Sequence, residues 1–194
     1  MRNFVLFILC ISFNQAAELE LGASMPGMDH SMIDISGKDL TLGDIKGENG
    51  TLVIFSCNTC PWVIRWEDRY VTIAESYTPE GISVVAVNSN ASRFEGDDSL
   101  EKMATHAKEK KYNFPYVQDD NSTLARLFGA TKTPHIYLFD KSNRLVYRGA
   151  IDDNARDSKS VDEHFLADAI DNLIEGKPIE KPISKAIGCS IKFP

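Results

Sequence analysis

Cysteine is scarce in this chain. Four cysteines occur in 194 residues, and the single Cys-x-x-Cys pair, Cys57 and Cys60, has no second pair of cysteines or histidines to accompany it. A structural zinc site needs about four ligands, so no metal site is assigned to this pair. Basic residues are also too few to give a positive surface, since the formal net charge is −7, and this balance argues against nucleic acid as a partner. With no internal repeat and 43% hydrophobic residues, the chain is expected to form one domain with a substantial core.

The N-terminal apolar run from Phe4 to Phe13 is too short to span a membrane as a helix. It follows Arg2 and precedes Ala16 and Ala17, which is the pattern of a secretory signal peptide over residues 1–17. We therefore expect an exported, periplasmic protein with no stable membrane span after cleavage.

Two alternatives for the N-terminus stay open. An uncleaved membrane anchor is one, because Asn14 or Gln15 would stand where the cleavage site prefers a small residue. A lipoprotein modified at Cys10 is the other, although Leu9 is bulky for that site. If the signal is removed, Cys10 leaves with it and the cysteine count becomes odd.

The central feature of the sequence is an apolar, β-branched run that leads into the Cys pair. Residues Thr51 to Phe55 are too few for a helix and indicate a buried strand. After Pro61, apolar residues recur at steps of three and four while charged residues occupy the other face, which predicts an amphipathic helix. The apolar positions are Val63, Trp66, Tyr70, Ile73, Ala74 and Tyr77.

The predicted position of Cys57, exposed at the start of this helix, favours redox chemistry. The first helical turn carries unpaired N–H groups and a partial positive charge, and both stabilise a thiolate. Cys60 lies about one turn further on, so its sulfur can reach Cys57 and close a small disulfide ring. We therefore predict Cys57 as nucleophile and Cys60 as its resolving partner, with no cofactor. A purely structural disulfide is disfavoured, because so small a ring restrains the unfolded chain little.

The strand, Cys-x-x-Cys, proline and helix together resemble the thioredoxin-like superfamily. Longer strings resemble a bacterial group of redoxin-domain proteins described as peroxiredoxin-like and related to alkyl hydroperoxide reductase and thiol-specific antioxidant. These strings are Cys-Asn-Thr-Cys-Pro-Trp-Val from residue 57, Thr-Pro-His-Ile-Tyr-Leu-Phe-Asp from 133, Tyr-Arg-Gly-Ala-Ile-Asp-Asp-Asn from 147 and Ala-Ile-Gly-Cys-Ser-Ile-Lys from 186. The resemblance covers roughly residues 25 to 194.

The resemblance implies a thioredoxin-like α/β fold, with a mixed central sheet, helices on both faces and an N-terminal β-hairpin extension. It also implies a cis bond before Pro134, with Thr133 offering backbone groups of a substrate groove to an extended peptide. The implied activity is thiol–disulfide exchange on exported proteins. The partners would be protein thiols and disulfides, together with a redox partner that recycles the Cys pair.

Beyond the signal peptide, the sequence divides into three parts: an extended lead-in over residues 18–30, a redoxin domain over 31–176 and an extended tail over 177–194. The tail contains three prolines. Within the domain, the last helix is expected to begin at Ser160, because Ser160 and Glu163 have the spacing of a capping box, and to stop at Gly176.

A peroxiredoxin-like thiol peroxidase is the rival enzymatic interpretation, because Cys60-Pro61 resembles the Cys-Pro of peroxiredoxins. The pattern Pro-x-x-x-Thr-x-x-Cys of that family would need proline at Val53 and threonine at Cys57. The hydroxyl that helps to position peroxide is therefore replaced by a thiol, and thiol–disulfide exchange is favoured.

Copper binding or copper delivery is an alternative of another class. Met25, Met28, His30 and Met32 offer thioether and imidazole groups, which suit Cu(I). The same methionines would equally serve as apolar contacts of the lead-in and the first strand.

Pro61, Trp62, His135 and Cys189 are further candidate site residues. Pro61 and Trp62 adjoin the thiols, and Trp62 either shapes access to them or packs along the helix. His135 either touches the rim of the site or only opens a strand. Cys189 is either a buried packing residue or a third redox thiol, since the tail is long enough to return to the helix start.

Cleavage of the signal peptide predicts a mature chain that begins near Ala17 or Glu18. N-terminal sequencing of protein from the exported fraction is expected to show this start. Exported protein that still begins with Met1 would contradict cleavage.

Overall fold

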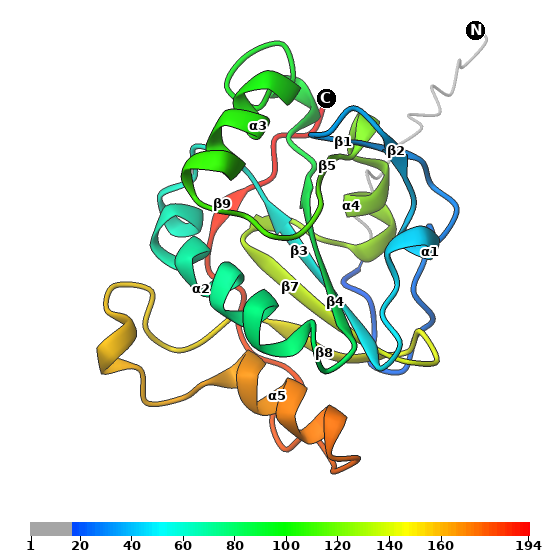
Figure 1. The fold of residues 1–194 in the computed structure, drawn as a ribbon, viewed down its shortest axis with the longest axis vertical. Coiled ribbons are helices and arrows are strands. Elements are labelled where there is room, and N and C mark those ends of the chain that lie inside the picture. Colours follow the sequence, from blue (N-terminus) through cyan, green and yellow to red (C-terminus); the bar gives the residue numbers. More distant parts are fainter. Residues whose placement is uncertain (1–16) are drawn as a thin grey trace, which may run out of the picture.

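A seven-stranded mixed sheet forms the centre of the molecule (Figure 1). The computed structural model describes residues 17–194, so the predicted signal peptide, apart from its last residue, and Cys10 lie outside the described residues. The strand order is β2-β1-β5-β4-β3-β7-β8. These strands are β1 (Met32–Asp34), β2 (Asp39–Leu40), β3 (Gly50–Ser56), β4 (Ile82–Asn88), β5 (Tyr116–Gln118), β7 (His135–Asp140) and β8 (Leu145–Gly149). A second, two-stranded sheet pairs β6 (Lys132–Thr133) with β9 (Cys189–Ser190).

The central strand β3 is buried along its whole length. It pairs in parallel with β4 on one side and antiparallel with β7 on the other. Strand β5 adds in parallel beyond β4, and the hairpin of β1 and β2 covers that edge. The chain leaves β3 at Ser56, so the residues that follow, beginning with Cys57, emerge from the middle of the sheet.

Helices cover both faces of the sheet, as predicted (Figure 1). The helices are α1 (Leu42–Ile45), α2 (Pro61–Tyr77), α3 (Leu100–Glu109), α4 (Thr123–Phe128) and α5 (Phe165–Ile174), with short 3₁₀ turns η1 (Ala91–Arg93), η2 (Asp120–Ser122) and η3 (Ser158–Ser160). None of the helices within residues 17–194 has both the length and the apolar character needed to cross a membrane.

Two hydrophobic cores follow from the alternation of side chains along β3. Leu52 and Ile54 pack in one cluster with residues of α2 and α5, whereas Val53 and Phe55 pack in the other with residues of α4. The four apolar residues of β3 thus pack alternately into the two cores, which explains the continuous apolar run in the sequence.

The prediction that the last helix begins at Ser160 is wrong, because the helix begins at Phe165. The Ser160 hydroxyl donates instead to Asp157 Oδ2 at 2.7 Å, within the 3₁₀ turn η3. The Glu163 carboxylate is paired with Lys181 Nζ at 2.8 Å. Both residues of the expected capping box therefore have other partners.

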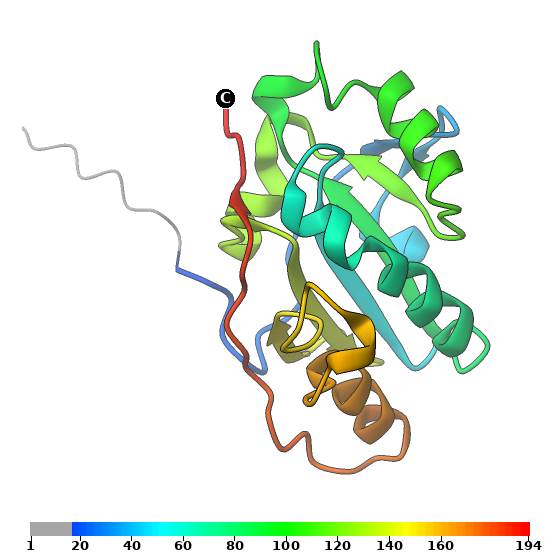
Figure 2. The same cartoon turned by 90° about the vertical axis from the view of Figure 1, so that its left-hand side faces the viewer.

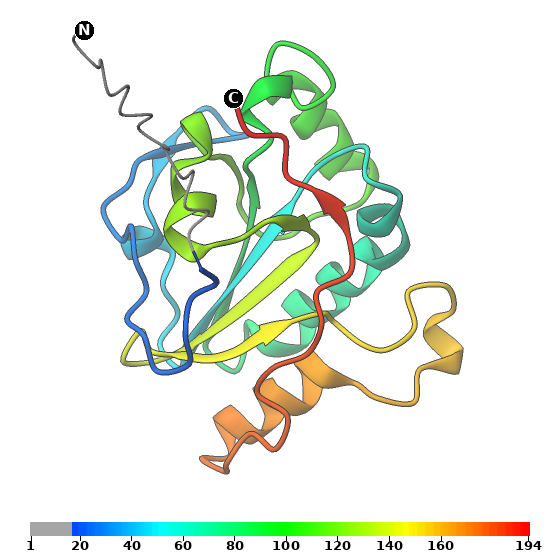
Figure 3. The ribbon, with the colours of Figure 1, turned by 180° about the vertical axis from the view of Figure 1, so that it is seen from behind.

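The C-terminal tail is extended and runs along the edge of the main sheet toward the helix α2 (Figure 3). Arg148 of β8 donates its backbone N–H to Pro182 at 3.0 Å and accepts from the Ser184 N–H at 3.0 Å. Further on, the tail forms β9 against β6. The tail is therefore held by regular backbone hydrogen bonds.

Glu67 is a buried charge that links α2 to α3. Its carboxylate contacts His106 Nε2 at 2.7 Å and Lys110 Nζ at 2.6 Å. Burial alone would raise the pKa of Glu67, but these two partners outweigh it and hold the pKa below its ordinary value. Because the pKa is lower in the folded chain, the stabilisation is present above the unfolded pKa and is lost as the pH falls through the folded pKa.

We expect Glu67→Gln to lower the free energy of unfolding at pH 7 by about 1–3 kcal/mol, because it removes a buried, paired charge. The difference from wild type should shrink as the pH falls below about 4.3, the ordinary Glu value. Chemical denaturation at several pH values measures both. The control is Glu163→Gln, which removes an exposed ion pair with Lys181 and should cost less than about 1 kcal/mol. Equal losses in the two variants at pH 7 would contradict the prediction.

Candidate redox site

The two cysteines lie in and at the end of the short connection between β3 and α2. Cys60 is the N-cap residue of α2 and Pro61 is its first residue, a position that proline favours because its missing N–H would have no partner there. Cys57 lies three residues before the cap. Both cysteines are 3% exposed, so the prediction of an exposed Cys57 at the helix start is wrong. Burial follows because the connection is covered by Thr133 and by the tail.

Thr133 contacts both sulfur atoms. Its hydroxyl lies 3.3 Å from Cys57 Sγ, and its carbonyl accepts a hydrogen bond from Cys60 Sγ at 3.1 Å. The Thr133–Pro134 bond is cis, as the resemblance implied. The structure therefore brings together four of the residues predicted from the sequence: Cys57, Cys60, Thr133 and Pro134.

The two thiols share one proton unequally. Contact with Cys57 lowers the pKa of Cys60 to about 4, and the Cys189 thiol and the backbone N–H groups of Val63 and Cys189 act in the same direction against burial. Contact with Cys60, burial and the Asp98 charge raise the pKa of Cys57. The pair therefore loses its first proton readily and holds the second, because each thiol acts on the pKa of the other. The attack by Cys57 on a substrate stays a prediction.

A buried carboxylate, Asp98, holds the connection between the cysteines. Asp98 Oδ1 accepts from the backbone N–H of Asn58 at 2.9 Å and from Asn88 Nδ2 at 2.9 Å, and Oδ2 accepts from Asn90 Nδ2 at 3.0 Å. The Tyr116 hydroxyl donates to Asn58 Oδ1 at 2.9 Å. Asn58 is thus fixed from two sides, and the position of both sulfurs depends on it.

The sequence analysis missed this network, although one signal was available. Asn88 is the last residue of the buried strand β4, which is parallel to β3, and Ser89 and Asn90 directly follow it. The carboxyl ends of neighbouring parallel strands meet at one edge of a sheet, so polar residues there face the cysteine connection. Asp98 comes from a loop, and its position has no local signal.

Trp62 packs at the surface of α2. Its ring lies 6.0 Å from that of Trp66, and the Arg65 guanidinium lies 5.1 Å above it. Trp66 is buried and donates its indole N–H to Asp152 at 2.9 Å. The Trp62 side chain therefore packs along the helix, while its backbone N–H lowers the pKa of Cys189 slightly.

The contacts of His135 lie within the sheet and the N-terminal segment. It is buried at the start of β7, and its ring packs on Tyr137 with centroids 4.6 Å apart. Burial, with the nearby Lys132 charge, lowers the pKa of His135 to about 4, so the ring is neutral at pH 7. Within the described part of the chain, its polar neighbours are the Tyr137 hydroxyl and the Glu18 carboxylate rather than a thiol.

Cys189 lies beside the Cys pair. It is the β9 residue paired with Thr133, and its thiol interacts directly with that of Cys60. Burial, and next the Cys60 sulfur, raise the pKa of Cys189 to about 11. The sequence left two interpretations of Cys189 open, a buried packing residue and a third redox thiol. Cys189 is partly exposed, so it is not a fully buried packing residue.

The methionines proposed for copper have packing positions. Met25 and Met32 are buried in the core cluster that contains Phe55, and His30 faces the Asp119 carboxylate at 3.3 Å. Within residues 17–194, no group of three or more His, Cys, Asp or Glu side chains is arranged to hold a metal ion.

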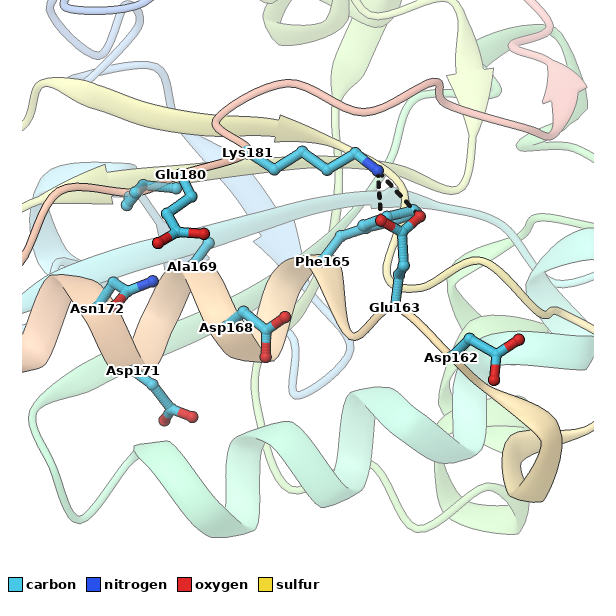
Figure 4. Close-up of a pocket in the computed structure, with 10 residues that line it drawn as sticks. Asp162, Glu163, Phe165, Asp168, Ala169, Asp171, Asn172, Glu180 and Lys181 are labelled. Atoms are coloured by element: carbon cyan, nitrogen blue, oxygen red, sulfur yellow. Dashed lines mark hydrogen bonds and ion pairs between the residues drawn. The ribbon is translucent and has the colours of Figure 1, made fainter.

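A hollow between α5 and the tail lies apart from the thiols (Figure 4). Its charged lining residues are Asp162, Glu163, Asp168, Asp171, Glu180 and Lys181. The figure shows Lys181 reaching across to Glu163, with the other carboxylates spread along the rim. No cysteine lines this hollow, so we do not include it in the redox site.

A strand that ends in a buried Cys-x-x-Cys, a helix capped by its second cysteine, and a Thr-Pro segment against both sulfurs define a thioredoxin-like protein. Within this class the chain belongs to the AhpC/TSA family, whose model matches residues 21–148. The predicted fold and family are therefore confirmed.

Two solved structures are similar over most of the chain. An uncharacterized conserved protein from Geobacillus kaustophilus is 35% identical with a TM-score of 0.83, and covers 90% of this chain and 93% of its own. A hypothetical protein from Sinorhizobium meliloti 1021 is 32% identical with a TM-score of 0.83, covering 92% of this chain and 97% of its own.

More distant structures share the fold alone. Peroxidoxin BcpB from Mycobacterium tuberculosis is 14% identical with a TM-score of 0.59, and the match covers 81% of this chain and 96% of that protein. A comparison with curated protein sequences finds no significant match.

We expect Asp98→Asn to lower the pH at which Cys57 becomes reactive, by about one unit, because it removes a negative charge that raises the pKa of Cys57. The rate of iodoacetamide alkylation against pH measures this. Asp97→Asn is the matched control, since Asp97 carries an exposed side chain and binds Asn58 through its backbone carbonyl. A profile that stays unchanged or moves upward in Asp98→Asn would contradict the prediction.

Proposed function

We propose that the protein is a thiol–disulfide oxidoreductase whose Cys57 and Cys60 cycle between dithiol and disulfide. The observation that carries this proposal is that Thr133 contacts both sulfurs at the start of α2, Cys57 Sγ at 3.3 Å and Cys60 Sγ at 3.1 Å. Two thiols in this position can form a disulfide without any large movement of the chain, and a thiolate is already present in the reduced state.

The reaction has two steps. The Cys57 thiol first passes its proton to the adjacent Cys60 thiolate, and the Cys57 thiolate attacks a substrate disulfide to give a mixed disulfide and one substrate thiol. Cys60 then loses the proton and attacks Cys57, which forms the Cys57–Cys60 disulfide and releases the second substrate thiol. Two electrons pass from the pair to the substrate, and the low pKa of Cys60 favours the second step.

The substrates in this proposal are disulfides and thiols of exported proteins. Thr133 and Pro134 would face the substrate chain, with Pro61 and Trp62 at the rim. The segment over residues 1–17 would direct the chain to the periplasm, residues 18–30 would lead into the redoxin domain at 31–176, and a separate redox partner would restore the Cys pair.

A second candidate function is peroxide reduction, and the lowered pKa of Cys60 favours it. Cys60 precedes Pro61 at a helix N-terminus and belongs to an AhpC/TSA domain. In this case the Cys60 thiolate attacks the peroxide and becomes a sulfenic acid, with release of an alcohol or water. Cys57 then attacks that sulfenic acid, which gives the Cys57–Cys60 disulfide and water.

The two functions are distinguished by measuring insulin-disulfide reduction and hydrogen-peroxide consumption side by side. For thiol–disulfide exchange we expect insulin reduction, and a loss of at least about a hundredfold in Cys57→Ser and in Cys60→Ser. Trapping gels should show mixed disulfides accumulating in Cys60→Ser and absent in Cys57→Ser. The reverse pattern, with peroxide consumed and insulin untouched, would replace the first function by the second.

A further inference from the structure

The tail strand β9 occupies the edge that an extended substrate would use. It pairs antiparallel with β6, with Thr133 opposite Cys189 and Lys132 opposite Ser190, and Ile191 donates its N–H to the Thr131 carbonyl at 3.0 Å. Figures 2 and 3 show this part of the tail crossing the start of α2. An extended peptide that bound Thr133 would have to take the place of β9.

Gly188 allows the tail to lie flat on the Thr133–Pro134 segment. A Cβ atom at Gly188 would stand 2.3 Å from the Thr133 carbonyl oxygen and 2.6 Å from its carbonyl carbon, both backbone atoms that cannot move aside. The close approach therefore requires glycine at this position, directly before Cys189.

The tail is also fixed on both sides of Cys189. On one side, Ser184 Oγ accepts from the Ala150 N–H at 2.9 Å and lies 2.7 Å from the Tyr147 hydroxyl. On the other side, Lys192 donates its N–H to Asn90 Oδ1 at 2.8 Å and accepts from the Ser92 hydroxyl at 3.0 Å. These hydrogen bonds hold Cys189 in one position.

That position puts three sulfurs in a series with Cys60 in the middle. The three cysteines meet at Thr133: Cys57 Sγ lies 3.3 Å from the Thr133 hydroxyl, Cys60 Sγ lies 3.1 Å from the Thr133 carbonyl, and Cys189 is paired with Thr133 across β6 and β9. The Cys57 and Cys189 thiols both act on the pKa of Cys60. In a disulfide between Cys57 and Cys60, the sulfur next to Cys189 is that of Cys60. Attack on Cys60 would expel Cys57 as the leaving thiolate.

We propose that Cys189 is an internal substrate of the Cys pair: its thiolate attacks Cys60 of the Cys57–Cys60 disulfide, forms a Cys60–Cys189 disulfide and releases the Cys57 thiolate. One S–S bond forms as one breaks, the Cys189 proton passes to solvent or to Cys57, and no external oxidant or reductant is consumed. This inference rests on the proposed function, because it requires the Cys57–Cys60 disulfide to form.

The test uses the full mature chain, oxidised with diamide, alkylated and digested with trypsin. Cys57 and Cys60 fall in the peptide 47–65, and Cys189 falls in the peptide 186–192. In Cys57→Ser we expect these two peptides to be disulfide-linked within one chain. The matched control is Cys60→Ser, which keeps Cys57 and Cys189 and should give at least about tenfold less of the linked product, because it lacks the sulfur that Cys189 contacts.

The outcomes separate the inference from the function. No link in Cys57→Ser, or equal links in both variants, overturns the internal exchange while leaving the pair intact. A wild-type protein that forms no Cys57–Cys60 disulfide within peptide 47–65 overturns the proposed function itself. A small fraction of linked product in oxidised wild type is the expected result if both hold.

A variant at Gly188 tests whether the pairing of β9 with β6 is needed to place Cys189 beside Cys60. Gly188→Ala should displace β9, lower the link in the Cys57→Ser background about tenfold and speed the alkylation of Cys60. Gly96→Ala is the control, since a Cβ there would meet its nearest neighbour at an ordinary 3.6 Å. An unchanged link in Gly188→Ala would show that the strand pairing does not position Cys189, and would overturn this part of the inference.

Discussion

The register of β3 against β7 is the constraint on which the site depends. Phe55 pairs with His135 in an antiparallel ladder, so the residues two steps beyond on each side, Cys57 and Thr133, face one another where the strands part. The 3.3 Å contact between Cys57 Sγ and the Thr133 hydroxyl follows from that pairing. A shift by one residue would turn every side chain of β3 to the opposite core, so the same packing that stabilises the sheet also fixes the distance between the cysteines and Thr133.

Thr133 then serves two sets of partners at once. Its carbonyl and hydroxyl contact the two sulfurs, and its strand position pairs with Cys189 of the tail. The tail therefore covers the Thr133 side of the Cys pair. The family resemblance implies that a substrate peptide binds on this side. Both cysteine residues are only 3% exposed, and their contacts with Thr133 contribute to this burial, in contrast to the exposed Cys57 expected from the sequence.

The secondary-structure elements that hold the Cys pair could be predicted from local residue patterns. The apolar run of β3 and the proline at the start of α2 each carry a residue-level signal, and the strand and the helix are present. The cis bond before Pro134 was implied by the family resemblance, and it is also present. The start of α5 differs from the prediction because Ser160 has a local partner, Asp157, and Glu163 has a more distant one, Lys181, and both compete with a capping box. Asp98 and the place of the tail depend on contacts between residues far apart in the sequence, which no local spacing reveals.

The pKa of Cys60 links the C-terminal tail to the proposed thiol–disulfide exchange. Part of what holds the pKa of Cys60 low comes from the thiol and the backbone N–H of Cys189, groups that belong to the tail. A substrate that displaced β9 would remove both donors, and its own backbone would then have to complete the Thr133 edge. In the proposed cycle the tail and the substrate are therefore alternative occupants of one edge. In this proposal the Cys189 thiol and backbone N–H keep the pKa of Cys60 low until a substrate chain displaces β9 and donates equivalent hydrogen bonds.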